Sequence, residues 1–228
     1  MVLFFAVGAQ AETTNTLSDA EIQGRKLAQQ LSEAQPAENF TNTGTLQIRH
    51  RGGPRAGFRF QFCTALTATN WLVIYETTGE GYRVKFLIVH NPGGTQSFEI
   101  RGAEILKCEP ADSFAGSDFW LGDLGLDFFH WPEQKVLKKE VKRSRGCTVL
   151  ESTNPNPSTN SYSRVVSWID GESGGIVQAE AYDFNGKLLK EFAPKSFKKV
   201  NGQWELQEME IRNVQTGSRT RLEFNLKK

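Results

Sequence analysis

The chain has 228 residues, of which 38% are hydrophobic and 23% are charged, and its formal net charge is +1. This composition is ordinary for a soluble globular protein, and a net charge so close to zero gives no reason to expect nucleic acid or an acidic membrane as a partner. Sixteen Phe and five Trp stand against two Met and four Tyr. Such large rings without polar groups favour deep burial or an apolar cavity.

The chain begins with an apolar run at residues 3–7, followed by Ala9-Gln10-Ala11, which matches an A-x-A processing site. This pattern is typical of the second half of a secretory signal peptide, and we expect cleavage after Ala11. No other stretch approaches the roughly 18 consecutive apolar residues of a membrane helix. We therefore expect residues 1–11 to be a partial signal peptide and residues 12–228 to form a single exported, soluble domain.

Export would place the three cysteines, Cys63, Cys108 and Cys147, in an oxidising compartment. Because three is an odd number, at most one disulfide forms within the chain. We expect the bridge Cys108–Cys147, since both cysteines follow a charged turn and flank an aromatic central segment.

A helix is predicted near the N-terminus, over residues 18–34. Ser18 and Glu21 have the spacing of a capping box, and Leu17 and Ile22 have that of a hydrophobic staple. The apolar face of this helix is thin, so we expect the helix to cover another layer and not to form the core itself.

Half-buried strands are indicated by apolar residues with a period of two, most clearly at Phe58, Phe60 and Phe62. Residues 71–75 and 84–89 are apolar on both faces, and strands of that kind need a cover on each side. The N-terminal helix can supply one cover. Another layer, the central segment or a bound apolar ligand would supply the second, which gives the chain the character of a container.

Further short strands follow, with turn signals at regular intervals. The expected strands include residues 97–101, 104–107, 147–151, 162–169, 204–213 and 219–226, with a turn at 91–94 and two-residue hairpins at Asn185-Gly186 and Asn201-Gly202. A slip in the alternation between Leu206 and Met209 predicts a β-bulge. Residues 135–145 are compatible with a helix or a strand. About eleven or twelve strands predict a mainly β fold, either an antiparallel barrel or a strongly curved sheet.

The central segment, residues 119–132, reads FWLGDLGLDFFHWP and carries more aromatic surface than its length needs. Asp118 and Asp123 are both candidate N-caps of a short helix. One apolar stripe of that helix is formed by Leu121, Leu124 and Phe128. Two glycines argue against a long helix and favour a bent segment of one or two turns. Two interpretations stay open, a plug of the core and a lid over an apolar cavity.

No catalytic or metal-binding pattern is present in the sequence. His50, His90 and His130 lie far apart, and there is no zinc motif, nucleophile elbow or nucleotide-binding loop. Asp127 could orient His130, but no nucleophile accompanies the pair. We therefore expect a binding protein that is not an enzyme and that uses no cofactor or metal.

A basic run follows the central segment directly and consists of Lys135, Lys138, Lys139, Lys142, Arg143 and Arg145. One interpretation is a solvated edge strand, whose lysines discourage pairing with another sheet edge. The other is a docking patch for anionic lipid or an acidic partner, formed by Lys135, Lys138, Lys139 and Lys142. Nucleic acid is not an expected partner outside the cytoplasm.

Several stretches together resemble the LolA-like family of bacterial outer-membrane lipoprotein-sorting proteins. They are GTLQIR, DFWLGDLGLDFFHWPEQKVL, RGCTVLES, AYDFNGKLLKEF, VNGQWELQEMEIRN and TRLEFNL, behind a secretory signal and a short helix. The resemblance covers residues 17–226. It implies an open, strongly curved antiparallel sheet, an incomplete β-barrel, with helices over the concave face that holds the acyl chains of a lipoprotein.

The same resemblance implies that residues 135–145 form a strand, that an inner-membrane ABC transporter supplies the lipoprotein and that an outer-membrane receptor accepts it. No arginine here matches the one that the well-studied carriers use within the lid region, so their release mechanism does not carry over.

On these grounds we expect a periplasmic, monomeric carrier that shields lipid acyl chains in an apolar cavity. The expected cavity residues are Phe58, Phe60, Phe62, Trp71, Phe86 and Ile88. The expected lid residues are Trp120, Leu124, Phe128 and Trp131. The alternative is a periplasmic sensor or scaffold of the same fold that binds a protein or lipid signal through the basic run.

Overall fold

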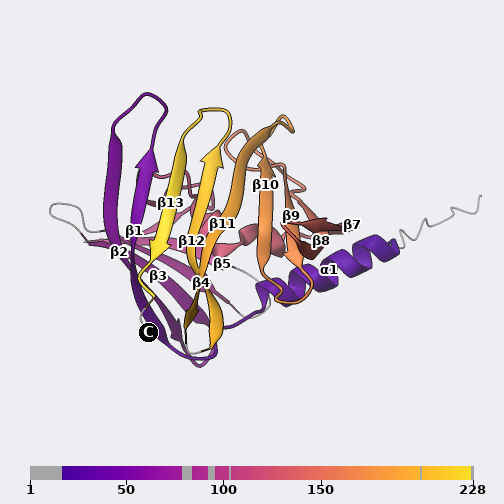
Figure 1. Cartoon of the computed structure of the whole chain (residues 1–228), viewed down its shortest axis with the longest axis horizontal. Coiled ribbons are helices and arrows are strands. Elements are labelled where there is room, and N and C mark those ends of the chain that lie inside the picture. Colours follow the sequence, from indigo (N-terminus) through magenta and orange to yellow (C-terminus); the bar gives the residue numbers. More distant parts are fainter. Residues whose placement is uncertain (1–16, 79–83, 92–95, 103, 201, 227–228) are drawn as a thin grey trace, which may run out of the picture.

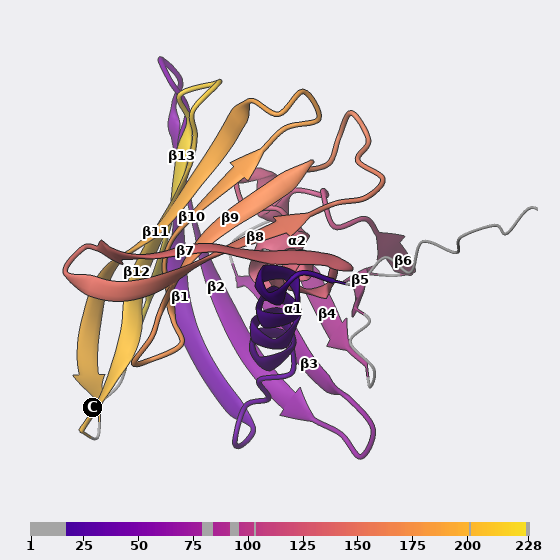
Figure 2. The same cartoon turned by 90° about the vertical axis from the view of Figure 1, so that its right-hand side faces the viewer.

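The fold is a single curved sheet of thirteen strands with short helical elements inside its curve (Figures 1 and 2). The computed structural model describes residues 17–78, 84–91, 96–102, 104–200 and 202–226. The strand order is β6-β5-β4-β3-β2-β1-β13-β12-β11-β10-β9-β8-β7, so β6 and β7 are the two edges of an open sheet. The expected mainly β fold, a strongly curved antiparallel sheet that forms an incomplete barrel, is confirmed.

The elements follow one another along the chain as a helix, six strands, three short helical turns and seven further strands. They are α1 (Asp19–Ser32), β1 (Phe40–Arg49), β2 (Arg55–Leu66), β3 (Trp71–Thr78), β4 (Lys85–His90), β5 (Gln96–Arg101), β6 (Ile105–Cys108), η1 (Phe114–Gly116), α2 (Leu121–Gly125), η2 (Asp127–His130), β7 (Glu133–Lys142), β8 (Arg145–Thr153), β9 (Arg164–Asp170), β10 (Ile176–Tyr182), β11 (Leu188–Val200), β12 (Gln203–Asn213) and β13 (Arg219–Phe224). The predicted signal peptide lies outside the described residues, as do residues 92–94 of the predicted turn and Asn201 of the second hairpin.

The start of α1 matches its prediction. Ser18 is the N-cap, and both halves of the capping box are present, with the Ser18 N–H donating to the Glu21 carboxylate at 2.7 Å. Leu17 is 40% exposed and Ile22 is 53% exposed, and their contact as a hydrophobic staple stays a prediction. The helix α1 docks through a different face.

That face is built on two small residues of the helix, Gly24 and Ala28, which are both buried. A Cβ at Gly24 would lie 2.6 Å from the backbone carbonyl of Gln134 in β7, so only glycine permits this approach. The helix contacts β7, β8 and η2. The expectation that α1 covers the apolar strands at residues 71–75 and 84–89 is therefore wrong, because α1 lies on the opposite half of the sheet.

The strands expected to be apolar on both faces are β3 and β4. On the concave side, Phe86 and Ile88 of β4 are 2% and 0% exposed, and on the other face Leu87 is 1% exposed. Burial on both faces is confirmed for β4. Its concave cover is the segment between β6 and β7, described below.

Several connections differ in detail from their predictions. Residues 135–145 are not one strand, because Arg143 and Ser144 adopt left-handed conformations (φ 50° and 62°) and turn β7 into β8. The expected two-residue turn at Asn185-Gly186 is a longer connection, since the Asp183 carboxylate accepts hydrogen bonds from the N–H groups of Asn185 and Lys187. The predicted bulge in β12 is confirmed by a register shift on its pairing with β11.

All three cysteines are free, so the expected Cys108–Cys147 disulfide is wrong. The strand order gives the reason: Cys108 lies in the edge strand β6, whereas Cys147 lies in β8, next to the opposite edge. Within the described ranges, no helix is long and apolar enough to cross a membrane.

Candidate functional site

The candidate site is formed by the covering segment, residues 114–131, which lies within the curve of the sheet (Figure 2). It consists of η1, α2 and η2 with short connections. Leu126 separates α2 from η2 because its backbone is left-handed, with φ at 54°. The predicted bent segment of one or two helical turns is therefore confirmed.

The first half of the covering segment fills the concave side of β2 to β5. Phe114 is completely buried, and its ring centre lies 5.0 Å from that of Phe86 and 5.3 Å from that of Tyr75. Phe119 and Leu121 are 1% and 0% exposed in the same core cluster. These side chains are the second cover that the two-sided strands require.

Gly125 lets α2 lie directly on β4 and β5. A Cβ there would approach Gln96 Oε1 to 3.0 Å and Ile88 Cγ2 to 3.1 Å, which is tighter than ordinary van der Waals contact. The Gln96 amide also donates a hydrogen bond of 2.6 Å to the Gly125 carbonyl. A larger residue at position 125 would therefore need Gln96, Ile88 or Phe98 to shift by a few tenths of an ångström.

The second half of the segment packs on the other half of the concave face, against β8 to β10. Phe128 and Phe129 are 5% and 3% exposed, in a cluster with Leu150 of β8 and Ala28 of α1. The Gln134 amide donates to the Phe128 carbonyl at 2.9 Å. The covering segment therefore joins both halves of the curved sheet through apolar contacts.

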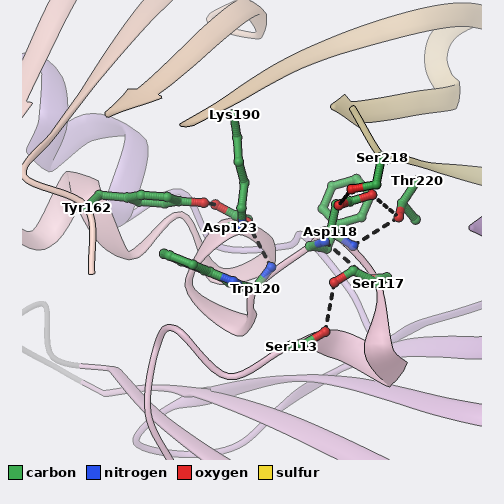
Figure 3. A network of polar contacts seen from close by, with 10 residues as sticks. Ser113, Ser117, Asp118, Trp120, Asp123, Tyr162, Lys190, Ser218 and Thr220 are labelled. Carbon is green, nitrogen blue, oxygen red and sulfur yellow. Dashed lines mark hydrogen bonds and ion pairs between the residues drawn. The ribbon is translucent and has the colours of Figure 1, made fainter. Parts of the chain in front are cut away.

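A buried ion pair fixes α2 to the middle of the sheet (Figure 3). Lys190 of β11 places its Nζ 3.2 Å from Oδ2 of Asp123 and 3.6 Å from the centre of the Trp120 ring. The Tyr162 hydroxyl donates to the other carboxylate oxygen of Asp123 at 2.8 Å. Because the Lys190 side chain is only 3% exposed, its charge depends on these neighbours.

Burial determines how these groups ionise. Loss of water lowers the pKa of the Lys190 ammonium, and the Asp123 carboxylate acts in the opposite direction. Burial also raises the pKa of the Tyr162 hydroxyl well above its usual value, and the charge of Asp123 adds to that shift. Tyr162 is therefore a neutral hydrogen-bond donor to the carboxylate that faces Lys190.

Asp118 makes a second attachment, to β13. Its carboxylate accepts hydrogen bonds from the hydroxyls of Ser218 and Thr220, the latter at 2.8 Å, and its N–H donates to Thr220 Oγ1 at 3.0 Å (Figure 3). The expectation that Asp118 and Asp123 are N-caps is wrong. Trp120 occupies the N-cap position of α2. Asp123 lies in the first turn of the helix, and its carboxylate accepts a hydrogen bond from the Trp120 N–H.

The six expected cavity residues all belong to the apolar cluster on the concave face. Three are buried and three are only partly buried: Phe60, Phe86 and Ile88 in the first group, and Phe58, Phe62 and Trp71 in the second. The register explains part of this arrangement, since Phe62 lies opposite Tyr75, and Tyr75 lies opposite Phe86. Their role in ligand binding stays a prediction.

The covering segment leaves a small cavity between itself and the described part of the sheet. This apolar cavity of about 40 Å³ lies beside Asp123 and Lys190, and is lined by Leu126, Phe128 and Val165 among others. One water molecule needs roughly 10–15 Å³ of such cavity volume, so the cavity has room for about three waters and is too small for an acyl chain. An acyl chain bound in this cavity would have to displace part of the covering segment.

The four expected lid residues lie in the covering segment but differ in burial. Phe128 is buried, whereas Trp120, Leu124 and Trp131 are half-buried. An open groove of about 830 Å³ runs past Trp120, Phe128 and Trp131, between the covering segment and residues 158–162. Whether these side chains act as a lid stays a prediction.

An apolar rim is exposed at the end of the sheet where β1 begins and β11 turns into β12. Trp204 is 70% exposed, Phe197 54% and Phe40 39%. Leu206 packs against the cluster on the concave face. Phe197 lies opposite Leu206 on the neighbouring strand, and Trp204 precedes Leu206 by two residues, so Phe197 and Trp204 point to the same concave face as Leu206. This rim was not predicted from the sequence. The signal for it was the pair Phe197 and Trp204, one on each side of the predicted hairpin at Asn201-Gly202.

The basic run lies on the edge strand β7 and its turn, as the edge-strand interpretation predicts. Several of its charges have partners: the Lys138 ammonium lies 2.7 Å from the Glu140 carboxylate, and that of Lys142 lies 4.3 Å from the centre of the Trp168 ring. Arg143 donates to the Pro194 carbonyl at 3.0 Å. The docking role of Lys135, Lys138, Lys139 and Lys142 stays a prediction.

In the part of the chain that the structure describes, no group of three or more His, Cys, Asp or Glu side chains is placed to hold a metal ion.

A family model described as "Uncharacterized protein" matches residues 101–227, more than half of the chain. The chain belongs to this family. No curated protein matches it by sequence.

Solved structures resemble the chain over nearly its whole length. A DUF1329 family protein from Desulfovibrio piger has 18% identity and a TM-score of 0.76, covering 91% of this chain and 92% of that one. A domain from Vibrio parahaemolyticus, classed with outer membrane lipoprotein-sorting proteins, has 18% identity and a TM-score of 0.75, with 90% and 92% covered. A LolA superfamily protein from Nitrosomonas europaea has 15% identity and a TM-score of 0.63, with 89% and 91% covered. The fold is LolA-like. In this fold, the covering segment occupies the concave face of the open sheet (Figure 2).

Proposed function

We propose that this LolA-like protein is a periplasmic carrier that binds lipid acyl chains, those of lipoproteins, on its concave face. One observation carries the proposal: an apolar concave face is covered by a short bent segment that packs on both halves of the sheet. The resemblance to a domain classed with lipoprotein-sorting proteins supports the same substrate class.

Burial of apolar groups would supply the free energy of acyl-chain binding. Each CH₂ group moved from water into an apolar site contributes roughly 0.8 kcal/mol, so a dozen groups contribute about 10 kcal/mol before ordering costs. An acyl chain on the concave face would replace the contacts that Phe114, Phe119 and Leu121 make with the sheet. Replacement of one apolar surface by another lowers the cost of moving the covering segment.

The exposed apolar rim is the proposed entry point. Trp204, Phe197 and Phe40 continue the apolar concave face to the open end of the sheet. In the proposed cycle, the protein takes its cargo from an inner-membrane ABC transporter and delivers it to an outer-membrane receptor. The family resemblance supports these two partners.

The first test is lipid extraction and mass spectrometry of the natively purified protein. We expect phospholipid or acylated peptide in near-stoichiometric amount. An empty protein that also fails to bind an apolar dye would contradict the carrier function. The alternative, a sensor or scaffold, would then explain the fold better.

A substitution tests whether the covering segment takes part in binding. Leu124 is half-buried against the concave cluster, so Leu124→Asp should weaken lipid binding at least tenfold through a charge in the apolar site. Circular dichroism should show an intact β-sheet. Leu137→Asp, on the 45% exposed Leu137 of β7, is the matched control and should bind lipid normally. Loss of the sheet signal in Leu124→Asp alone would show that the segment is only a core plug.

A further inference from the structure

Four arginines form a row across four neighbouring strands on the outer face of the sheet. Pairing places Arg55 of β2 opposite Arg49 of β1, Arg49 opposite Arg219 of β13, and Arg219 opposite Arg212 of β12. All four side chains are exposed. Since neighbouring strands lie about 4.8 Å apart, this arginine row extends over roughly 14 Å.

The arginine row lacks neutralising partners. Within the described residues, none of the four guanidinium groups forms an ion pair, whereas neighbouring charges do. Glu210 pairs with Lys195 at 3.0 Å and with Arg221 at 3.3 Å. The next residue across the sheet from Arg212 is Glu191 of β11, which makes no ion pair with it.

The repulsion between the four guanidinium groups of the row destabilises the folded sheet. Like charges directly opposite one another on adjacent strands destabilise a sheet, and here three consecutive pairings are Arg with Arg. Natural proteins break local rules of this kind mainly where function requires it. The row therefore indicates an anionic partner that neutralises it.

The surroundings of the row narrow the class of partner. The adjoining outer-face positions are Gly57, Gln47, Arg221 and Glu210, without an apolar or aromatic side chain. A protein partner would need an apolar centre in its interface, and single-stranded nucleic acid would need aromatic rings for its bases to stack on. A shallow hollow of about 420 Å³ lies along three of the four arginines, between the β1–β2 and β12–β13 turns. Besides Arg49, Arg212 and Arg219, it is lined by His50, Arg51 and Glu210. A flat array of guanidinium groups suits a surface of phosphodiesters, which guanidinium binds in a bidentate manner.

We propose that the arginine row docks the protein on a membrane surface rich in anionic phospholipid. This role goes beyond acyl-chain binding and does not depend on it. The row lies at the end of β1, whereas the apolar rim lies at its start, so the ten residues of the strand separate them. Docking and lipid uptake can therefore be separated by substitution.

The test is co-sedimentation of the purified protein with vesicles of phosphatidylglycerol and phosphatidylcholine, compared with phosphatidylcholine alone. We expect binding only to the anionic vesicles, and a steep loss of binding as salt is raised. Each arginine near an anionic surface contributes about fivefold in affinity, so Arg→Gln at all four positions should weaken binding on the order of several hundred-fold. The quadruple variant should melt no lower than the parent protein, because like-charge pairs are removed.

The matched control removes the same number of charges elsewhere, at the exposed Lys26, Lys107, Lys187 and Lys199, and should keep binding within about twofold. An equal loss in this control would mean that net charge, and not the row, drives binding, and would overturn the proposal. Loss of binding on replacing Lys135, Lys138, Lys139 and Lys142 of β7, with the arginine variant unaffected, would assign docking to the basic run. A higher affinity for a poly-glutamate peptide or a DNA duplex than for the vesicles would also overturn it.

Discussion

Lys190 brings a positive charge into the interior of the sheet, and the groups around it explain why it is tolerated. Asp123 supplies the opposite charge at 3.2 Å, and the Trp120 ring lies 3.6 Å from the ammonium. The Tyr162 hydroxyl orients the carboxylate from its other oxygen. Removing one member of such a buried pair is costly because the remaining charge is left without compensation.

Asp123→Asn should therefore lower the free energy of unfolding by about 3–5 kcal/mol, as expected for a broken buried ion pair. In a chain of this size, the melting temperature should fall by roughly 6–20 °C. Thermal and urea denaturation measure both quantities. The double variant Asp123→Asn/Lys190→Met should recover more than half of the loss, since it leaves no unpaired ammonium. A double variant as unstable as the single one would show that the charge pair is not the cause.

The partners of these aspartates could not be predicted from the sequence. Asp118 and Asp123 fit the local pattern of helix capping, and local patterns contain no information about groups far along the chain. The actual partners are 67 residues away for Asp123 and Lys190, and 102 residues away for Asp118 and Thr220. The arginine row was missed for the same reason, because Arg49 and Arg219 become neighbours only when the strand order is known.

At the scale of single elements, α1 shows which features are local. Its capping box depends on residues three apart, and it was predicted correctly. Its packing partner depends on Gly24, whose missing side chain lets the helix approach the backbone of β7. A thin apolar face predicted that the helix covers something, but it held no information about which strands are covered. The bulge in β12 was predictable because it shifts the local alternation.

Gly24→Ala should displace α1 from β7. The added Cβ would lie 2.6 Å from backbone atoms of Gln134 and Lys135, which cannot move without disturbing β7. Overpacking of this kind costs about 1–3 kcal/mol, more than the roughly 1 kcal/mol that alanine contributes through helix propensity. Hydrogen exchange of the α1 amides should accelerate.

Gln23→Ala is the matched control, because Gln23 is exposed and gains helix propensity without a clash. It should leave α1 at least as protected as in the parent protein. Equal protection of α1 in Gly24→Ala and Gln23→Ala would contradict the close approach of the helix to β7.

For the whole molecule, the fold class was predictable and the closed interior was not. Alternating apolar residues and regular turn signals are repeated along the whole chain, so single errors in strand boundaries do not change the predicted sheet. The apolar concave face was likewise predicted through Phe58, Phe60 and Phe62. Whether that face encloses space depends on how side chains of the covering segment fill it, and only the structure shows that Phe114 and Phe119 do so.

Because the interior cavity measures only about 40 Å³, lipid binding should be visible as movement of the covering segment. Hydrogen exchange of the lipid-loaded protein should be at least tenfold faster at residues 114–131 than in the delipidated protein. Amides of β8 and β9 serve as the internal reference and should exchange equally in both states. Bound lipid with unchanged exchange at residues 114–131 would show that the ligand lies elsewhere, for instance on the exposed rim.

The position of the covering segment in the chain restricts how it can move. It connects β6 to β7, and these strands are the two free margins of the sheet. A segment tethered at one end could swing away like a flap, but this one is tethered at both ends to opposite margins. Lifting it and separating the margins are then a single motion, so cargo size would set how far the sheet spreads. The distance between β6 and β7 would report whether the protein is full or empty.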